Sequence, residues 1–380
     1  MRLKDARIIR GETCETLASK IGVTKQAVSR YEKGEMIPAS DVIDKISQSL
    51  KVSKNYLTKV DMVKPDELNM IFYRSCKIKK KEEDLVRAYA KWCYEIVVAM
   101  KECEIDTAWI PPLFKSDMNI EEKAIILRDK WKLEEVPIED ILRVIEDNGI
   151  HVFVLDLMTN DIDAYSQIIC GIPIIIINKQ KGTAVRRRFS LAHELGHIIL
   201  HASIKQEMIK DPQERQRIEN EANQFASNFL MPRRGFYRDI ARSDLQSLSK
   251  LKSKWKVSIY AIIKRCEELM VFGESLEDNK TRFISIQKQL IRNGWKKKEP
   301  YDDEIPYEEP RRMAEIMRGF KVQNRILEFF FDLVCFPVEN LLSMCNVADL
   351  YGQKSENLYS NSYETDDIEN VQQSFLLSSD

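Results

Sequence analysis

Three of the four histidines in the chain fall within nine residues, from His193 to His201, and the first five of these residues read H-E-x-x-H. On a helix, positions i and i+4 share one side and lie about 6 Å apart along the axis. The rings of His193 and His197 can therefore reach one cation, and Glu194 can deprotonate a water beside it. Because neutral imidazoles suit zinc, the run predicts a Zn2+ site with Glu194 as catalytic base. A chance match is the alternative.

A third ligand is expected from the helix predicted over residues 218–230. Glu219 lies one turn from Asn223, on a face that it shares with two alanines, and that face can meet a helix presenting two histidines. Glu221 lies about 160° around the helix from Glu219 and is the weaker candidate. We therefore predict that Glu219 completes the zinc site with the two histidines. Solvation of both carboxylates is the alternative.

The other two histidines are not expected to bind the ion. On a straight helix His201 lies roughly 12 Å along the axis from His193, so we interpret it as a packed residue or as a neighbour of a ligand. His151 stands in a predicted strand and is interpreted as a packed or surface residue. Tyr165 is a candidate for stabilising an oxyanion, although no pattern in the sequence fixes its position.

Residues 1–58 predict a small all-helical domain that contains a helix-turn-helix. Gly22 ends one helix, and Thr24 caps the next helix, over residues 25–33. This second helix is expected to enter the major groove of double-stranded DNA by its N-terminal part. The side chains expected to read bases or bind phosphates are Lys25, Gln26, Ser29 and Arg30.

Charge supports the DNA-binding interpretation of this segment. Residues 1–58 carry eleven Lys and Arg against seven Asp and Glu, a net charge of +4, whereas the whole chain has a net charge of -1. Any nucleic-acid signal must therefore be local. The alternative is a helical bundle that serves only dimerisation or partner binding.

Composition bears mainly on the cellular compartment. The chain is 44% hydrophobic and has eight scattered cysteines without a C-x-x-C pair, which is typical of free thiols in a reducing cytoplasm. No N-terminal signal segment and no membrane-spanning apolar run are evident. We expect a cytoplasmic protein without a membrane partner, and a homodimer is one option for its assembly.

Two known families resemble parts of the chain. The run 24–34 has a glutamine near the helix start and closes with Glu-x-Gly, and it closely resembles the Xre/Cro-type repressor domain. Three further segments follow in order: R-F-S-L-A-H-E-L-G-H at 188–197, E-N-E-A-N-Q-F-A at 219–226 and L-M-P at 230–232. Together they resemble the ImmA/IrrE family of zinc metallopeptidases, over about Glu121 to Glu268.

The second resemblance implies a zincin-like metallopeptidase domain in which His193, His197 and an acidic residue hold zinc and Glu194 is the base. It also implies a regulatory protease whose substrate is typically a helix-turn-helix repressor. We therefore expect a DNA-binding transcriptional regulator with a zinc-dependent endopeptidase domain that cleaves a partner protein, a repressor or toxin encoded nearby.

Two alternatives to this function stay open. One is a regulator or antitoxin whose peptidase-like domain binds a partner with little or no proteolysis. The other is a metal-dependent sensor without a protease role. The intact Glu194 favours the enzyme over the sensor, because a purely structural zinc site does not need a base.

The hydrophobic pattern indicates a mainly α-helical chain with a small β-sheet, an α+β class. Strands are expected at 150–155 and 172–178, with a third short strand or a turn at 163–166, and an element of uncertain type at 282–290. The expected organisation, in chain order, is a helix-turn-helix domain at 1–58, a linker and helical region at 59–119, the metallopeptidase domain at 120–235, a helical module resembling a second helix-turn-helix at 236–299, a C-terminal helical region at 300–351, and a disordered tail at 352–380.

Overall fold

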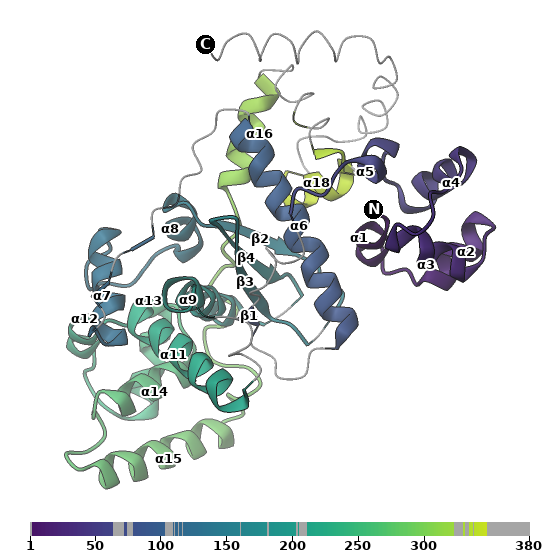
Figure 1. Cartoon of the computed structure of the whole chain (residues 1–380). Coiled ribbons are helices and arrows are strands. Elements are labelled where there is room, and N and C mark those ends of the chain that lie inside the picture. Colours follow the sequence, from purple (N-terminus) through teal and green to yellow (C-terminus); the bar gives the residue numbers. More distant parts are fainter. Residues whose placement is uncertain are drawn as a thin grey trace.

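In the computed structural model the chain is mostly helical with one small β-sheet, which confirms the predicted α+β class (Figure 1). The structure describes residues 2–63, 72–73, 79–102, 109, 111–112, 114–115, 117–159, 161–180, 182–202, 204, 211–322, 330, 334–336 and 338–347. The predicted tail at 352–380 lies outside the described residues. None of the helices within these ranges combines the length and the apolar character that crossing a bilayer requires.

The N-terminal unit contains five helices: α1 (Leu3–Ile9), α2 (Cys14–Ile21), α3 (Lys25–Lys33), α4 (Ser40–Leu50) and α5 (Lys54–Thr58). Helices α2 and α3 form the predicted helix-turn-helix. Gly22 follows α2 with φ 72°, a left-handed conformation that glycine adopts without steric cost. The side chain of Thr24 then accepts a hydrogen bond from the backbone N–H of Ala27. These two residues fix where α2 ends and α3 begins.

The sheet has four strands in the order β1-β3-β4-β2. They are β1 (Phe72–Tyr73), β2 (His151–Leu155), β3 (Ala164–Ile169) and β4 (Ile172–Asn178). Strand β2 pairs parallel with β4, whereas β3 pairs antiparallel with both β4 and β1. Cys170 and Gly171 join β3 to β4 with φ values of 47° and 79°, as in a type I′ hairpin turn. The segment predicted as a strand or a turn is therefore a strand.

Alternate side chains of the sheet belong to two hydrophobic cores on its opposite faces. On one face, Phe153 and Ile176 pack with α6 (Lys80–Glu102), the N-terminal unit, α16 (Arg312–Val322) and α18 (Val338–Met344). On the other face, Val152 and Ile175 share a core with a larger group of helices. These helices are α7 (Ile120–Lys130), α8 (Ile141–Asp147), α9 (Ala184–Leu200), α11 (Pro212–Leu230), α12 (Arg233–Arg238), α13 (Leu245–Trp255), α14 (Ile259–Glu268) and α15 (Leu276–Arg292).

Helix α6 lies between the N-terminal unit and the sheet (Figure 1). The guanidinium of Arg2 donates two hydrogen bonds to Glu95, at 2.8 and 2.6 Å, and both side chains are buried. On the sheet side, the hydroxyl of Tyr165 donates to the carbonyl oxygen of Val86 at 2.9 Å. The helix-turn-helix unit is therefore packed against the body of the molecule through α6.

The C-terminal half extends the sequence prediction in two places. The element of uncertain type at 282–290 belongs to the longer helix α15, whose start is capped by the side chain of Ser275. The acidic segment before α16 packs on α9, where Glu308 pairs with Arg188 and Glu309 pairs with Arg187. This segment therefore attaches α16 to the start of the helix that carries the H-E-x-x-H motif.

Candidate metal centre

The candidate metal centre lies where α9 and α11 pack against each other. A Cβ atom at Gly196 would lie 3.2 Å from the carbonyl oxygen of Ala222 and 3.2 Å from a ring carbon of Phe225. These are tight separations, so the absence of a side chain at Gly196 allows the two helices to approach closely. The close approach brings the histidines of α9 next to Glu219 and Asn223 of α11.

The three predicted ligands come together at this contact. The Nε2 atoms of His193 and His197 lie 3.1 Å apart. Glu219 Oε2 lies 3.4 Å from His193 Nε2, and Glu219 Oε1 lies 3.6 Å from His197 Nε2. Both rings are fully buried, and the side chain of Glu219 is 15% exposed. Ligands about 2.0–2.2 Å from a tetrahedral zinc ion stand roughly 3.4 Å from one another. The three separations match three corners of such a tetrahedron.

The surroundings of the rings also suit zinc, which binds neutral imidazole. Burial, together with the neighbouring His193 and His201, holds the pKa of His197 well below its ordinary value. The amide oxygen of Asn223 lies 3.1 Å from His193 Nδ1, so that nitrogen donates and Nε2 presents a lone pair to the cluster. Two imidazole nitrogens and one carboxylate form a donor set typical of catalytic zinc.

Comparison with known families finds matches for two parts of the chain. A family described as the IrrE N-terminal-like domain, peptidase family M78, matches residues 145–267, and a helix-turn-helix family matches residues 3–57. The chain contains a helix-turn-helix domain and an IrrE N-terminal-like domain. No curated protein matches it. The two family matches confirm the fusion predicted from the sequence, and they support a DNA-binding regulator with a peptidase-like domain.

Within the IrrE-like domain, Glu194 follows the first predicted ligand and is 1% exposed. Its Oε2 accepts a hydrogen bond from the hydroxyl of Ser166 on β3, at 2.6 Å. A short hydrogen bond to a carboxylate is among the stronger ones in proteins, so it fixes the orientation of this side chain. Ser166 was not among the predicted site residues, because its only mark in the sequence is a small polar side chain in a strand that is otherwise largely apolar.

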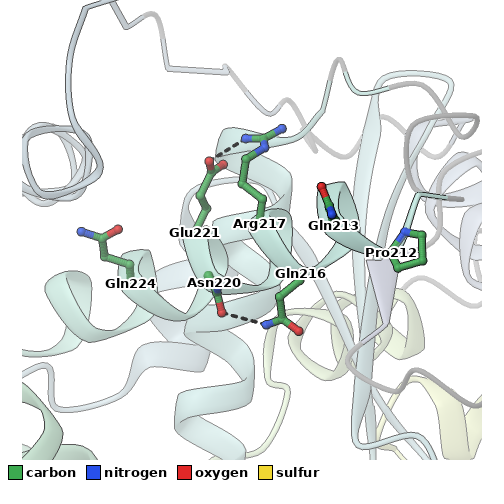
Figure 2. Close-up of a pocket in the computed structure, with 7 residues that line it drawn as sticks. All are labelled: Pro212, Gln213, Gln216, Arg217, Asn220, Glu221 and Gln224. Carbon is green, nitrogen blue, oxygen red and sulfur yellow. Dashed lines mark hydrogen bonds and ion pairs between the residues drawn. The ribbon is translucent and has the colours of Figure 1, made fainter.

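The outer side of α11 carries an open hollow of about 550 Å³ (Figure 2). Its lining consists mainly of amide and charged side chains: Pro212, Gln213, Gln216, Arg217, Asn220, Glu221 and Gln224. Glu221, the alternative third ligand, pairs here with Arg217, and its other oxygen contacts the buried His201. Of the two candidate acids, Glu219 faces the ligand rings and Glu221 faces His201 and the hollow.

The structure also locates Tyr165 and His151, two residues for which the sequence suggested roles. Neighbouring residues of a strand point to opposite faces of the sheet. Ser166 faces Glu194, and Tyr165 therefore lies on the other face, where its hydroxyl contacts α6. The interpretation of Tyr165 as an oxyanion donor is therefore wrong. His151 is buried, as expected for a packed residue, and burial lowers its pKa to about 3.

Helix α3 presents the residues predicted to contact DNA. Lys25, Gln26 and Arg30 are exposed and Ser29 is half-buried, while the opposite side of α3 packs into the core of the unit. Both long basic side chains are thus accessible to phosphates, and the glutamine amide is accessible to base edges.

Proposed function

We propose that this protein is a DNA-binding transcriptional regulator whose IrrE-like domain is a zinc-dependent endopeptidase that cleaves a partner regulatory protein, a repressor or a toxin. The observation that carries the proposal is the convergence of His193, His197 and Glu219 at separations that suit zinc, with Glu194 adjacent on the same helix. A carboxylate in this position favours hydrolysis over metal sensing, because a structural zinc site has no use for a base.

The residues of the site have distinct roles in peptide hydrolysis. Bound zinc supplies Lewis acidity toward the peptide carbonyl and toward a water molecule. Glu194 accepts a proton from that water as it attacks the carbonyl carbon, and then delivers the proton to the nitrogen of the leaving amine. Ser166 keeps the carboxylate of Glu194 in one orientation during both proton transfers.

Partner binding with little or no proteolysis is the second candidate function. It is favoured by the burial of Glu194, which is 1% exposed, since a catalytic base must reach its substrate. In that case the IrrE-like domain would recognise a partner, and the protein would act as a regulator or an antitoxin through DNA binding.

Incubation of the zinc-loaded protein with the product of the adjacent gene separates the two candidates. Glu194→Gln is the matched control, because it preserves the size of the side chain and leaves the three ligands intact. We expect cleavage by the wild type and a loss of about 100- to 10,000-fold in the variant, the usual contribution of a general base. Binding of the partner without cleavage by the wild type would support the second candidate.

A gel-shift assay on the upstream operator tests the DNA-binding part. Gln26→Ala and Arg30→Ala should each weaken binding, by about 1–3 kcal/mol if the side chain reads a base. The Glu194→Gln variant should bind DNA like the wild type, because Glu194 is on α9, whose apolar residues pack in the other hydrophobic core. Wild-type affinity in both α3 variants would refute the choice of recognition helix.

A further inference from the structure

We infer that His201 and Glu221 are positioning residues that fix which nitrogen of His197 carries its proton, and thereby direct a lone pair of His197 at the metal site. The inference rests on the proposed zinc site and extends it to the surface of α11. Neither residue belongs to the cluster of His193, His197 and Glu219, and each acts on the metal only through His197.

A continuous series of side-chain contacts runs from the metal site to the hollow in Figure 2. His197 Nδ1 lies 3.0 Å from His201 Nδ1, and His201 Nε2 lies 3.0 Å from Glu221 Oε2. The other oxygen of Glu221 accepts a hydrogen bond from Arg217 Nη1 at 2.6 Å, the pair drawn with a dashed line in Figure 2. His201 is 1% exposed, whereas the side chain of Arg217 is 46% exposed. This series of contacts thus begins at a buried ring and ends at a side chain that is exposed to solvent.

With Glu221 ionised and His201 neutral, these contacts fit one arrangement of protons. An ionised carboxylate only accepts hydrogen bonds, so Glu221 requires a proton on His201 Nε2. A neutral His201 then has a bare Nδ1, which can only accept. The 3.0 Å contact between the two Nδ1 atoms is a hydrogen bond only if His197 Nδ1 donates it. His197 Nε2 is then bare, and it is the atom that faces His193 Nε2 and Glu219.

The position of His201 at the end of α9 explains why it serves this role. It is the C-cap residue, with φ -118°, so it leaves the helical path after the i+4 spacing has brought it next to His197. Helix α11 consequently holds both ligand rings: Asn223 holds His193 directly, and Glu221 holds His197 through His201. Residues that fix ligand histidines in this way typically change metal affinity about 10- to 100-fold when they are removed.

Zinc affinity, measured on the full chain by competition with a chromogenic chelator, tests the inference. His201→Phe fills the same space without a hydrogen-bond acceptor and should weaken zinc binding about 10- to 100-fold. His201→Gln offers a carbonyl oxygen to His197 Nδ1 and should bind zinc more tightly than His201→Phe. If His201 mattered only for packing, this order would be reversed. Wild-type affinity in His201→Phe, or tighter binding by it than by His201→Gln, overturns the inference.

Glu221→Gln is the second variant in this test. A glutamine side chain can turn either its amide NH2 or its carbonyl oxygen toward His201 Nε2, so it no longer fixes the tautomer of His201. It should weaken zinc binding less than His201→Phe does. Glu214→Gln is its matched control, since Glu214 also pairs with Arg217 at 2.8 Å but does not contact His201. This control should retain wild-type affinity, and an equal loss in both variants would contradict a specific role for Glu221. Circular dichroism of each zinc-free variant verifies folding.

Nitrogen-15 spectra of selectively labelled histidine provide a readout independent of affinity. The chain has four histidines, so each ring of the zinc-loaded protein can be assigned. We expect His201 to carry a proton on Nε2 and none on Nδ1, and Glu221→Gln to mix the two tautomers. A proton on His201 Nδ1 in the wild type would overturn the inference.

The outcomes distinguish failure of the inference from failure of the proposed function. Zinc binding and cleavage by the wild type, with wild-type affinity in His201→Phe, would reject the positioning role alone. Zinc binding without cleavage, with the expected order of variants, would reject the peptidase and keep the positioning role. A wild-type protein that binds no zinc would reject both.

Discussion

At the scale of single residues, the contact between Ser166 and Glu194 joins the sheet to the proposed chemistry. Both side chains are almost fully buried, and their oxygens lie 2.6 Å apart. In a buried site a carboxylate without such a donor would be costly to keep ionised, because burial disfavours the charged form. The hydroxyl of Ser166 therefore supports both the charge and the orientation of Glu194.

Ser166→Ala removes this donor and leaves the three predicted ligands unchanged. A hydrogen bond to a charged group is worth about 1.5–3 kcal/mol, so we expect kcat for partner cleavage to fall about 10- to 100-fold with zinc affinity unaltered. Ser166→Thr retains a hydroxyl and should retain more activity than Ser166→Ala. Equal activity of Ser166→Ala and the wild type in a steady-state cleavage assay would show that the contact has no catalytic role.

Residues of the site differed in how far the sequence could predict them. The pairing of His193 with His197 follows from helical spacing, which depends only on the local chain, and Glu219 was predicted from its position on one face of its own helix. The structure brings these three together. Ser166 could not be found in this way, because its contact with Glu194 joins residues 28 apart and depends on how β3 packs on α9. From the sequence we interpreted His201 as a packed residue or a neighbour of a ligand. Its pairing with Glu221 could not be predicted, because this contact requires the packing of α9 on α11.

At the scale of elements, the spacing between α9 and α11 decides whether the ligands converge. Gly196→Val would bring side-chain atoms against the backbone of Ala222, and overpacking of this kind costs about 1–3 kcal/mol. We expect a lower free energy of unfolding in urea and weaker zinc binding, because the helices must move apart. Gly196→Ala is the milder comparison, since the gain of about 1 kcal/mol in helix propensity offsets part of its clash. Unchanged zinc affinity in Gly196→Val would contradict this spacing argument.

The contact between α8 and the start of α16 predicts that the free energy of unfolding depends on pH. Glu146 is buried in α8 and accepts hydrogen bonds from the backbone N–H groups of Arg311 and Arg312, at 3.1 and 3.2 Å. Burial outweighs these two bonds and raises the pKa of Glu146 from 4.5 to about 7. A raised pKa means that the folded state binds the proton more tightly than the unfolded state does. The protonated Glu146 therefore stabilises the folded state fully below about pH 4.5, and this stabilisation is lost as the pH rises through about 7.

Glu146→Gln keeps an acceptor oxygen for α16 and removes this titration. The free energy of unfolding of the wild type should fall relative to that of the variant between about pH 4.5 and pH 7, by an amount on the order of 3 kcal/mol. Urea unfolding curves of both proteins at several pH values measure this difference. Parallel pH profiles would show that Glu146 does not titrate in that range.

Elements also differed in how well the sequence defined them. Helices α3, α13 and α14 have side-chain caps and a clear apolar periodicity, so local rules predicted them. Strand β1 and the strand order were not predicted, because pairing between segments more than 90 residues apart leaves no local pattern. The full length of α15 was missed for a different reason, since its exposed apolar residues, among them Ile284 and Ile291, obscure the periodicity of its buried side.

At the scale of the whole molecule, α6 is the element that makes the DNA-binding unit and the sheet parts of one core. A second core, on the opposite face of the sheet, surrounds α9 and α11. The proposed DNA-binding surface on α3 and the proposed zinc site therefore lie on parts that pack in different cores, and these cores share the sheet. This arrangement explains why variants on α3 and variants at Glu194 are expected to act independently.

The buried pair of Arg2 and Glu95 predicts how the DNA-binding unit is held. Glu95→Gln preserves the shape but removes the buried counter-ion of Arg2 and leaves only the partly exposed Asp61, at 3.3 Å, which should cost up to about 3–5 kcal/mol. Because the N-terminal unit, α6 and one face of the sheet share a core, hydrogen exchange should accelerate in α1, in α6 and in β3 together. Asp5→Asn is the matched control, since the pair of Asp5 and Lys91 is only partly buried and should matter less. If exchange accelerated in α1 alone, the N-terminal unit would be shown to unfold independently of the sheet.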